Sequence, residues 1–340
     1  MRLIDLVHSS PRRLVVPLMG NPGAKLTNST IVQNEFNSEL QHRSIMALVE
    51  RFEPDAVFFM MDLAVEAGSI GLPVKFPLHE APTVEDHPVK CIEDLEQFKV
   101  LDPLYDARVR TYLDTMNRLS KSMDILKGAY IIGPFTFAGL MIGATQIAMS
   151  TVLNPALVHA AAEFATEISI RYGKALIESG ADMVAILEPT AALISEQTFV
   201  EFSQPYLKRL VQELDTMTIM HICGNTKHLI HAMCDTGAQG LNLDAPRDRT
   251  EAATMVPKDV VLMGNIDPVR VMVNETPQGV THAVDTLLNA MAPYPNFILS
   301  TGCDLPAETP LENIAALINA GKSELSRIKT PTSSPDLIIP

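Results

Sequence analysis

Hydrophobic and polar positions alternate in a regular way along the chain from about residue 125. Six short apolar runs have the length of β-strands: Ala129–Ile132, Met183–Leu187, Thr218–Ile222, Gly240–Leu243, Val260–Met263 and Phe297–Ser300. Five longer segments between or after these runs have the spacing of amphipathic helices: Ala156–Glu178, Glu196–Leu214, Thr226–Asp235, Pro277–Asn289 and Pro310–Leu325. Strand and helix alternate with short links, which predicts βαβ units and a parallel sheet.

This alternation also predicts how the sheet is closed. Asp55–Met60 adds an earlier strand, and six or more units favour an α/β fold of the closed (β/α)8 TIM-barrel type over an open sheet. Residues 1–50 are predicted as helix and loop, an N-terminal helical extension that caps one end of the barrel. Residues 330–340 are rich in Pro and Ser and are predicted as a flexible tail. Residues 1–329 therefore form a single predicted domain.

The composition narrows the classes of function. Of the 340 residues, 47% are hydrophobic and 19% are charged, which is typical of a globular protein with a large core. With 26 Lys and Arg against 40 Asp and Glu, the formal net charge is -14. A chain this acidic repels phosphate backbones and anionic lipid, so we expect no nucleic-acid partner and no membrane partner.

The placement of cysteines and charges favours a cytoplasmic protein. The four cysteines are too scattered to indicate a disulfide framework: Cys91, Cys223, Cys234 and Cys303. Charges near the start of the chain interrupt the apolar run that a signal peptide needs. Residues 128–162 contain no Asp, Glu, Lys or Arg, but Gly and Pro punctuate them. We therefore predict a strand, a glycine-rich turn and a buried helix there, not a membrane span.

Polar and metal-competent residues follow nearly every predicted strand. They are Asp62, Glu188, His221 with Cys223, Asp244, Asn265 with Asp267, and Cys303 with Asp304. The active residues of a (β/α)8 barrel lie at the C-terminal ends of its strands. We therefore expect this set to form a functional site at one rim of the barrel.

His221, Cys223 and Cys303 are candidate zinc ligands. His221 and Cys223 are two residues apart on one predicted strand, which places both side chains on the same face. Imidazole and thiolate are ligands that zinc prefers, and three protein ligands leave the fourth position open, as in catalytic zinc sites. The residues alone leave an alternative open, because buried cysteines are common and often inert.

Asp62 and Glu188 are candidate catalytic carboxylates. The alternative is that each caps the N-terminus of a helix, and the sequence favours neither interpretation. Asp304, beside Cys303, and Asn225, after Gly224, are candidates for contacts that orient a metal ligand.

Five segments of the sequence resemble the uroporphyrinogen decarboxylase superfamily, over nearly the whole chain. They are Gly133-Pro134-Phe135-Thr136 with Gly143, residues 176–182, residues 202–208, residues 264–268 and residues 309–313. The fold of that superfamily is a (β/α)8 barrel, which agrees with the predicted alternation of strands and helices.

Within that superfamily, the residues resemble the corrinoid-dependent methyltransferases more than the decarboxylases. The arginine-rich segment with which decarboxylases bind substrate carboxylates corresponds here to residues 19–24, which contain no arginine. Asp62 matches the decarboxylase aspartate, but the decarboxylase tyrosine after Phe135-Thr136 is missing, and Cys303 replaces its histidine. The branch similar to methylcobamide:coenzyme M methyltransferases has an H-x-C pair and a distant cysteine as zinc ligands. His221, Cys223 and Cys303 match these ligands.

The resemblance implies methyl transfer between a corrinoid, carried on a separate corrinoid protein, and a small molecule. A thiol activated by zinc is the expected small molecule, and Glu188, Asp244 or water would fill the fourth zinc position at rest. Gly139, Gly143 and Asn225 are the predicted cofactor-contacting residues, the two glycines because their small size lets a flat corrin approach.

Other functions remain open at this stage. One is an O-demethylase type of enzyme that moves methyl from a donor to the corrinoid protein, with zinc acting as a Lewis acid. Another is a decarboxylase that uses Asp62, and a third is a non-catalytic docking protein with a structural zinc. The sequence does not identify the methyl donor or acceptor, and it leaves a homodimer open as the assembly state.

Overall fold

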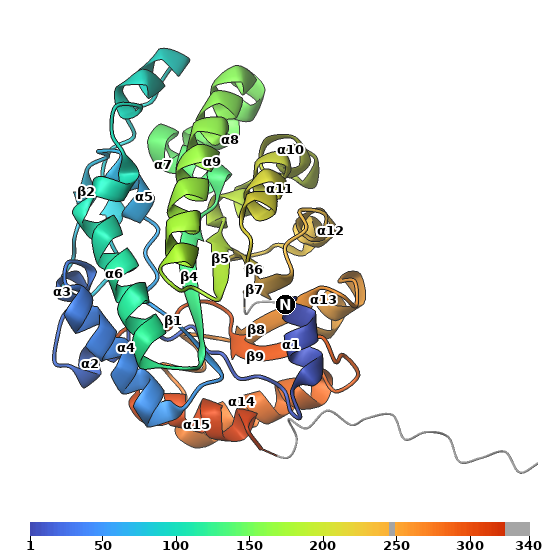
Figure 1. Ribbon diagram of the computed structural model, residues 1–340. Helices are drawn as coiled ribbons and strands as arrows, with labels where there is room; N and C mark the ends of the chain where they lie inside the picture. Colours follow the sequence, from blue (N-terminus) through green and yellow to red (C-terminus); the bar gives the residue numbers. More distant parts are fainter. Residues whose placement is uncertain (245–248, 324–340) are drawn as a thin grey trace, which may run out of the picture.

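The computed structural model describes residues 1–244 and 249–323, and a curled parallel sheet lies at its centre (Figure 1). Seven strands pair in the order β1-β4-β5-β6-β7-β8-β9. Their bounds are β1 Ala56–Phe58, β4 Leu126–Ile132, β5 Met183–Leu187, β6 Met217–Ile222, β7 Gly240–Leu243, β8 Val261–Ile266 and β9 Phe297–Thr301. Every predicted apolar run is therefore a strand, and all of these neighbours pair in parallel.

The gap between the first and last strands of this sheet is filled by the chain before α2. Val15 forms a parallel bridge with Leu299 of β9, and the amide of Val16 donates to the Leu299 carbonyl at 2.8 Å. On the other side, the amide of Asp55 donates to the Val15 carbonyl at 3.1 Å, just before β1. This segment thus lies in the position of an eighth strand and completes the TIM-barrel arrangement. The expectation of helix and loop for residues 1–50 did not include this extended segment.

Helices surround the strands and pack their apolar faces on them (Figure 1). The longer helices on the outside are α4 Ser38–Phe52, α6 Ala107–Ser122, α9 Pro155–Glu178, α11 Gln204–Glu213, α14 Pro277–Ala290 and α15 Leu311–Gly321. The predicted helix Glu196–Leu214 is in fact two helices, α10 Glu196–Phe202 and α11. Pro205 in the first turn of α11 explains the break, because proline cannot continue a helix from the preceding turn.

Shorter elements connect or cover the barrel. The helices are α1 Leu3–Ser9, α2 Gly23–Leu26, α3 Ile31–Glu35, α5 Val65–Ser69, α7 Pro134–Ile142, α8 Ala144–Leu153, α12 Ile230–Cys234 and α13 Arg249–Met255. The 3-10 turns are η1 Ile92–Phe98, η2 Pro103–Tyr105, η3 Pro189–Leu193 and η4 Lys227–Leu229. A small antiparallel pair consists of β2 Val74–Lys75 and β3 Thr83–Val84.

The helices that precede β1 lie at different positions around the barrel. The first helix, α1, lies at the N-terminal ends of the strands, where the amide of Leu3 donates to Gln239, next to the start of β7, at 2.8 Å. The fourth helix, α4, packs beside α6 and α15 as one of the outer helices. Thus α1 lies at the end opposite the strand C-termini, whereas Ala24 of α2 and Ile31 of α3 pack against Met60, just after β1. The predicted tail, residues 330–340, lies outside the described residues.

Residues 128–162 form most of β4, then α7, α8 and the start of α9. The predicted strand is confirmed, but the predicted glycine-rich turn is in fact the helix α7, and α8 is a second helix before α9. Among the described residues, no single helix is long and apolar enough to cross a membrane. The pair of α7 and α8 meets that test only together, and the two helices are bent by 101° relative to each other.

Candidate metal centre

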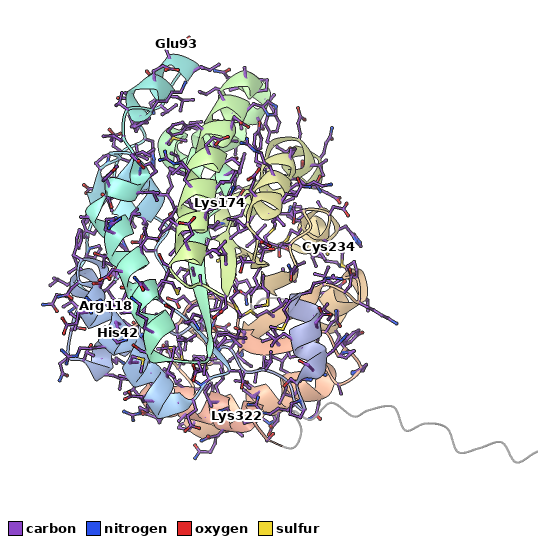
Figure 2. All side chains as sticks on the ribbon, viewed as in Figure 1. His42, Glu93, Arg118, Lys174, Cys234 and Lys322 are labelled. Carbon is purple, nitrogen blue, oxygen red and sulfur yellow. The ribbon has the colours of Figure 1, made fainter. Side chains whose placement is uncertain are left out.

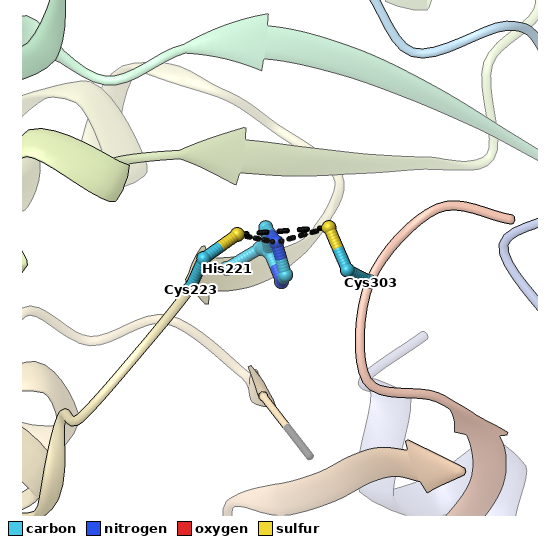
Figure 3. Close-up of side chains that lie close together, drawn as sticks. All are labelled: His221, Cys223 and Cys303. Carbon is cyan, nitrogen blue, oxygen red and sulfur yellow. Dashed lines mark hydrogen bonds between the residues drawn. The ribbon is translucent and has the colours of Figure 1, made fainter. Parts of the chain in front are cut away.

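His221, Cys223 and Cys303 lie together at the C-terminal ends of the strands (Figure 3). His221 is the second-to-last residue of β6, and Cys223 follows two residues later on the same face. Gly224, with φ of +83°, then turns the chain away, a conformation that glycine adopts without strain. Cys303 comes from the loop directly after β9. The three side chains point toward one another from two segments that are 80 residues apart.

The spacing of the three donor atoms suits one tetrahedral metal ion. Nε2 of His221 lies 2.9 Å from Sγ of Cys223 and 3.6 Å from Sγ of Cys303, and the two sulfurs are 3.6 Å apart. Ligands of a tetrahedral zinc, with bonds of about 2.0–2.3 Å, are separated by roughly 3.3–3.8 Å. Two soft thiolates and one imidazole are also the donors that zinc prefers. The donor types therefore fit zinc. The two distances to Cys303 lie within the tetrahedral range, whereas His221 and Cys223 are closer together than that range, at 2.9 Å.

Asn242 orients the imidazole of His221. The two residues are paired directly in the register of β6 and β7, and Oδ1 of Asn242 lies 2.5 Å from Nδ1 of His221. The Asn242 amide nitrogen donates to the carbonyls of Met263 and Thr301 at 3.3 and 3.2 Å. Because these carbonyls can only accept, the Asn242 oxygen must face His221. The proton of the neutral imidazole is then on Nδ1, which leaves the Nε2 lone pair free for a metal.

The thiols and the imidazole also affect each other's protonation. Hydrogen bonding from Cys223 lowers the pKa of Cys303 to about 4, although burial opposes this shift. The same contact, together with burial, raises the pKa of Cys223. Burial acts to lower the pKa of His221, but the Cys303 thiolate outweighs it and the pKa is raised. These shifts favour the thiolate form of Cys303, the form of cysteine that binds metals.

Glu188 lies wholly inside the protein, against the start of α7. Its two carboxylate oxygens accept hydrogen bonds from the amides of Phe135 and Thr136 at 3.0 and 2.9 Å, and from the Ser203 hydroxyl at 2.8 Å. Burial raises the pKa of Glu188, and these hydrogen bonds oppose the shift. Glu188 therefore stabilises the N-terminus of α7. Its predicted catalytic role stays a prediction.

Asp62 also lies in the interior, in an ion pair with Arg108 of α6. The amide of Ala64 donates to Asp62 Oδ1 at 2.7 Å, and the Tyr112 hydroxyl lies 3.5 Å from Oδ2. Burial raises the pKa of Asp62, while Arg108 acts to lower it. Asp62 is not part of the cluster of His221, Cys223 and Cys303. Its predicted catalytic role stays a prediction.

The residues predicted to contact a corrinoid are found in two different environments. Gly139 and Gly143 are buried at the joint between α7 and α8, and a Cβ on Gly139 would lie 3.2 Å from Thr190 of η3. Asn225, in contrast, is exposed and lines a pocket of 420 Å³ with Lys227, His228 and other residues. The glycines thus permit close packing of helices, and Asn225 has the more accessible position.

Asp244 and Asp304 flank the metal centre. Asp244 Oδ2 accepts a hydrogen bond from the amide of Gly224 at 2.8 Å, which ties the loop after β6 to the end of β7. Asp304 Oδ2 accepts from the amide nitrogen of Asn21 at 2.6 Å. The contact that orients His221 comes from Asn242, while the Asp304 backbone hydrogen-bonds to Cys303. The predicted roles of Asp304 and Asn225 stay predictions.

The sequence analysis missed Asn242 and Asn21. One signal for Asn242 was available, because it is the polar residue inside the apolar run Gly240–Leu243 of the neighbouring strand. No comparable signal marks Asn21. It precedes Asp304 by 283 residues and reaches it only through the closure of the barrel.

The two remaining cysteines, Cys91 and Cys234, are not part of this cluster, and Figure 2 labels Cys234. Cys234 lies at the end of α12 and is partly buried against the core. Cys91 is exposed before η1. Within the described part of the chain, the one cluster of metal-competent side chains detected is His221, Cys223 and Cys303.

Comparison with known proteins agrees with this geometry. Residues 10–323 match the family model described as uroporphyrinogen decarboxylase (URO-D). The methylcobamide:CoM methyltransferase MtbA of Methanosarcina acetivorans is 32% identical over 279 residues, which cover 79% of this chain and 80% of MtbA. A uroporphyrinogen decarboxylase of Synechococcus is 26% identical over 310 residues, 86% of this chain and 85% of that protein.

A solved structure supports the fold independently. The structure of a methyltransferase from Methanosarcina mazei superposes with a TM-score of 0.86 and 23% identity, covering 94% of this chain and 96% of that one. The family model spans nearly all of the described barrel, including the three clustered ligands. The chain belongs to the uroporphyrinogen decarboxylase family.

Proposed function

We propose that this protein is a zinc-dependent methyltransferase that moves a methyl group between a corrinoid and a small thiol. The observation that carries the proposal is the cluster of His221, Cys223 and Cys303 at the strand C-termini. His221 is buried, whereas both cysteines are only partly buried, so one side of the cluster is accessible from solvent. Three protein ligands with an accessible side are typical of a catalytic zinc. The similarity to MtbA, a methylcobamide:CoM methyltransferase, supports the same class of reaction.

The chain's own residues would hold the metal and set its charge. Nε2 of His221 and the two sulfurs are the ligands, with Asn242 holding the imidazole. A zinc ion bound here would supply one chemistry, the deprotonation of a substrate thiol at neutral pH. Because Cys223 and Cys303 both bind as thiolates, they balance the charge of Zn²⁺ and keep the substrate sulfur nucleophilic. A reducing compartment such as the cytoplasm preserves these thiolates.

The proposed reaction balances without another reactant. The substrate sulfur forms a bond to the methyl carbon of a methylcobamide, and the carbon–cobalt bond breaks. Its electron pair stays on the cobalt, which goes from Co(III) to Co(I), and the thiol proton passes to solvent. The products are a methyl thioether and the reduced corrinoid, which we expect to be carried on a partner corrinoid protein. In the reverse direction, the same site would transfer a methyl group from a methyl donor to the corrinoid.

Glu188 and Asp62 have positioning roles in this proposal. Glu188 fixes the start of α7, the helix that follows β4 at the same end of the barrel. Asp62 anchors Arg108 of α6. Asn225, Gly139 and Gly143 stay the residues proposed for the corrinoid side, with Asn225 the directly accessible one.

The test is methyl transfer from methylcobalamin to thiols, followed by the cobalt absorbance, with zinc measured on the same sample. We expect close to one zinc per chain, and less than about half an equivalent would count against the proposal. Cys303→Ser should lower the rate at least 100-fold, while Cys91→Ser, at an exposed cysteine, should not. If Asp62→Asn abolished activity and Cys303→Ser had no effect, a decarboxylase would be the better interpretation. Methyl transfer only from a methoxyarene to the corrinoid would indicate the O-demethylase direction.

A further inference from the structure

A small cavity lies beside the segment that follows the candidate ligand Cys303. It has a volume of 180 Å³ and is lined on one side by Asp304, the residue after Cys303, and by Leu305. Met61 and Leu63, in the loop after β1, and Asn21, before α2, line it as well. Pockets for drug-sized ligands are about 300–1,000 Å³, so this cavity suits a smaller molecule. Because Asp304 directly follows the candidate ligand Cys303, we expect the organic part of a metal-bound substrate to lie in this cavity.

Two hydrogen-bond acceptors in the polar wall of the cavity have no donor. The amide nitrogen of Asn21 donates to Oδ2 of Asp304 at 2.6 Å, which fixes how the Asn21 amide is turned. Oδ1 of Asn21 and Oδ1 of Asp304 are both shielded from solvent and make no hydrogen bond. An amide oxygen does not titrate, so Asn21 Oδ1 is an acceptor at every pH. Buried acceptors without a donor are rare and destabilising.

The cavity offers nothing that would bind an anion. None of the described residues lining it is basic. Two cations on neighbouring segments already have partners: Lys25 donates to the Thr309 carbonyl at 3.2 Å, and Arg108 pairs with Asp62. A sulfonate or carboxylate in the cavity would instead face the oxygens of Asn21 and Asp304.

From these observations, and resting on the proposed thiol methyltransferase function, we infer the class of the substrate. It is a small thiol with an apolar body and a hydrogen-bond donor, such as an amine or a hydroxyl, at its far end. Met61, Leu63 and Leu305 contact the body. Rotation about the terminal torsions of Asn21 and Asp304 exchanges the hydrogen bond between them for one from the substrate donor to a free oxygen. This specificity differs from that of the relative MtbA, a methylcobamide:CoM methyltransferase, because coenzyme M ends in a sulfonate.

Three thiols with the same two-carbon body test this inference: 2-aminoethanethiol, 2-mercaptoethanol and 2-mercaptoethanesulfonate. For each, kcat/KM is measured with methylcobalamin, and Kd is measured from the sulfur-to-cobalt absorption band of protein loaded with Co²⁺ in place of zinc. The second measurement reports binding without catalysis. We expect the amine or the hydroxyl to exceed the sulfonate at least tenfold in both quantities.

Asn21→Leu isolates the contribution of the cavity. Each thiol has the same intrinsic acidity whether wild type or Asn21→Leu binds it. A difference in thiol preference between the two proteins must therefore come from the cavity wall. We expect the preference to fall to less than threefold in Asn21→Leu, and to stay unchanged in Glu308→Gln, at an exposed carboxylate on the same segment. Metal content is measured for every variant.

Failure of this inference can be distinguished from failure of the proposed function. If wild-type protein binds and methylates the sulfonate as well as or better than the other thiols, this inference is overturned while the proposed function stands. If no thiol binds the Co²⁺ protein or accepts methyl, both are overturned. A wild-type preference that persists in Asn21→Leu would contradict the role of the cavity wall.

Discussion

Asn242 accepts the Nδ1 proton of His221 at 2.5 Å, and its own amide is held by two backbone carbonyls. This contact leaves the imidazole one orientation and one tautomer, with Nε2 facing Cys223 and Cys303. The metal centre therefore depends on a residue of β7 that is not itself a ligand.

Replacement of Asn242 should weaken zinc binding. Asn242→Leu keeps the size of the side chain but leaves the Nδ1 proton without an acceptor, and contacts of this kind contribute about 10–100-fold in metal affinity. Competition with a chromophoric chelator measures the change. Asn289→Leu, at an exposed position on α14, is the matched control. Unchanged zinc affinity in Asn242→Leu would show that packing alone orients His221.

Bound zinc should protect two of the four cysteines from alkylation. Cys91 is exposed and should react with iodoacetamide whether or not metal is present. Cys223 and Cys303 are partly buried ligands, so they should be modified in the metal-free protein and resist modification with zinc. Mass spectrometry of the peptides identifies each site. Equal labelling of Cys303 with and without zinc would remove it from the ligand set.

Glu188→Gln separates a helix-capping role from a metal-binding role. An amide cannot accept all the hydrogen bonds that the carboxylate receives from Phe135, Thr136 and Ser203, so we expect a loss of about 1–3 kcal/mol in the free energy of unfolding. Chemical denaturation of the metal-free protein measures this loss. Glu201→Gln, at an exposed position, is the control. If zinc affinity also fell tenfold, Glu188 would be the fourth ligand at rest.

Glu66 makes stability depend on pH. It is fully buried, its Oε1 accepts from the Ile132 amide at 2.8 Å, and burial raises its pKa from 4.5 to about 8. The folded protein thus binds this proton more tightly than the unfolded chain does. The resulting stability is complete below pH 4.5 and is lost as the pH rises to 8, at up to about 1.4 kcal/mol per pH unit.

Glu66→Gln removes this titration. Relative to wild type, the free energy of unfolding of the variant should be higher at pH 8 than at pH 5, by about 1–3 kcal/mol. Glu35 has a raised pKa of about 8 as well, so part of the pH dependence should remain. The exposed Glu50→Gln provides the comparison. Identical pH profiles for Glu66→Gln and wild type would mean that Glu66 is ionised in the folded protein.

The sequence determined the elements and the ligand types. Strand periodicity put His221 and Cys223 on one face, and a regular alternation of strands and helices indicated a barrel, in which strand C-termini share one rim. These patterns are local, so they can be read from neighbouring residues. The break at Pro205 is also local, and the prediction of one helix across it was wrong because apolar spacing was weighed above proline.

The tertiary structure decided the contacts between distant segments. The sequence analysis assigned residues 1–50 to helix and loop, and only the gap between β9 and β1 brings Val15 into an isolated bridge with Leu299. Pairing of β6 with β7 brings Asn242 to His221, and closure of the barrel brings Asn21 to Asp304. Glu188 and Asp62 could not be assigned from the sequence, because a carboxylate after a strand can face a helix, a cation or a substrate. Their partners come from other helices, and packing alone selects them.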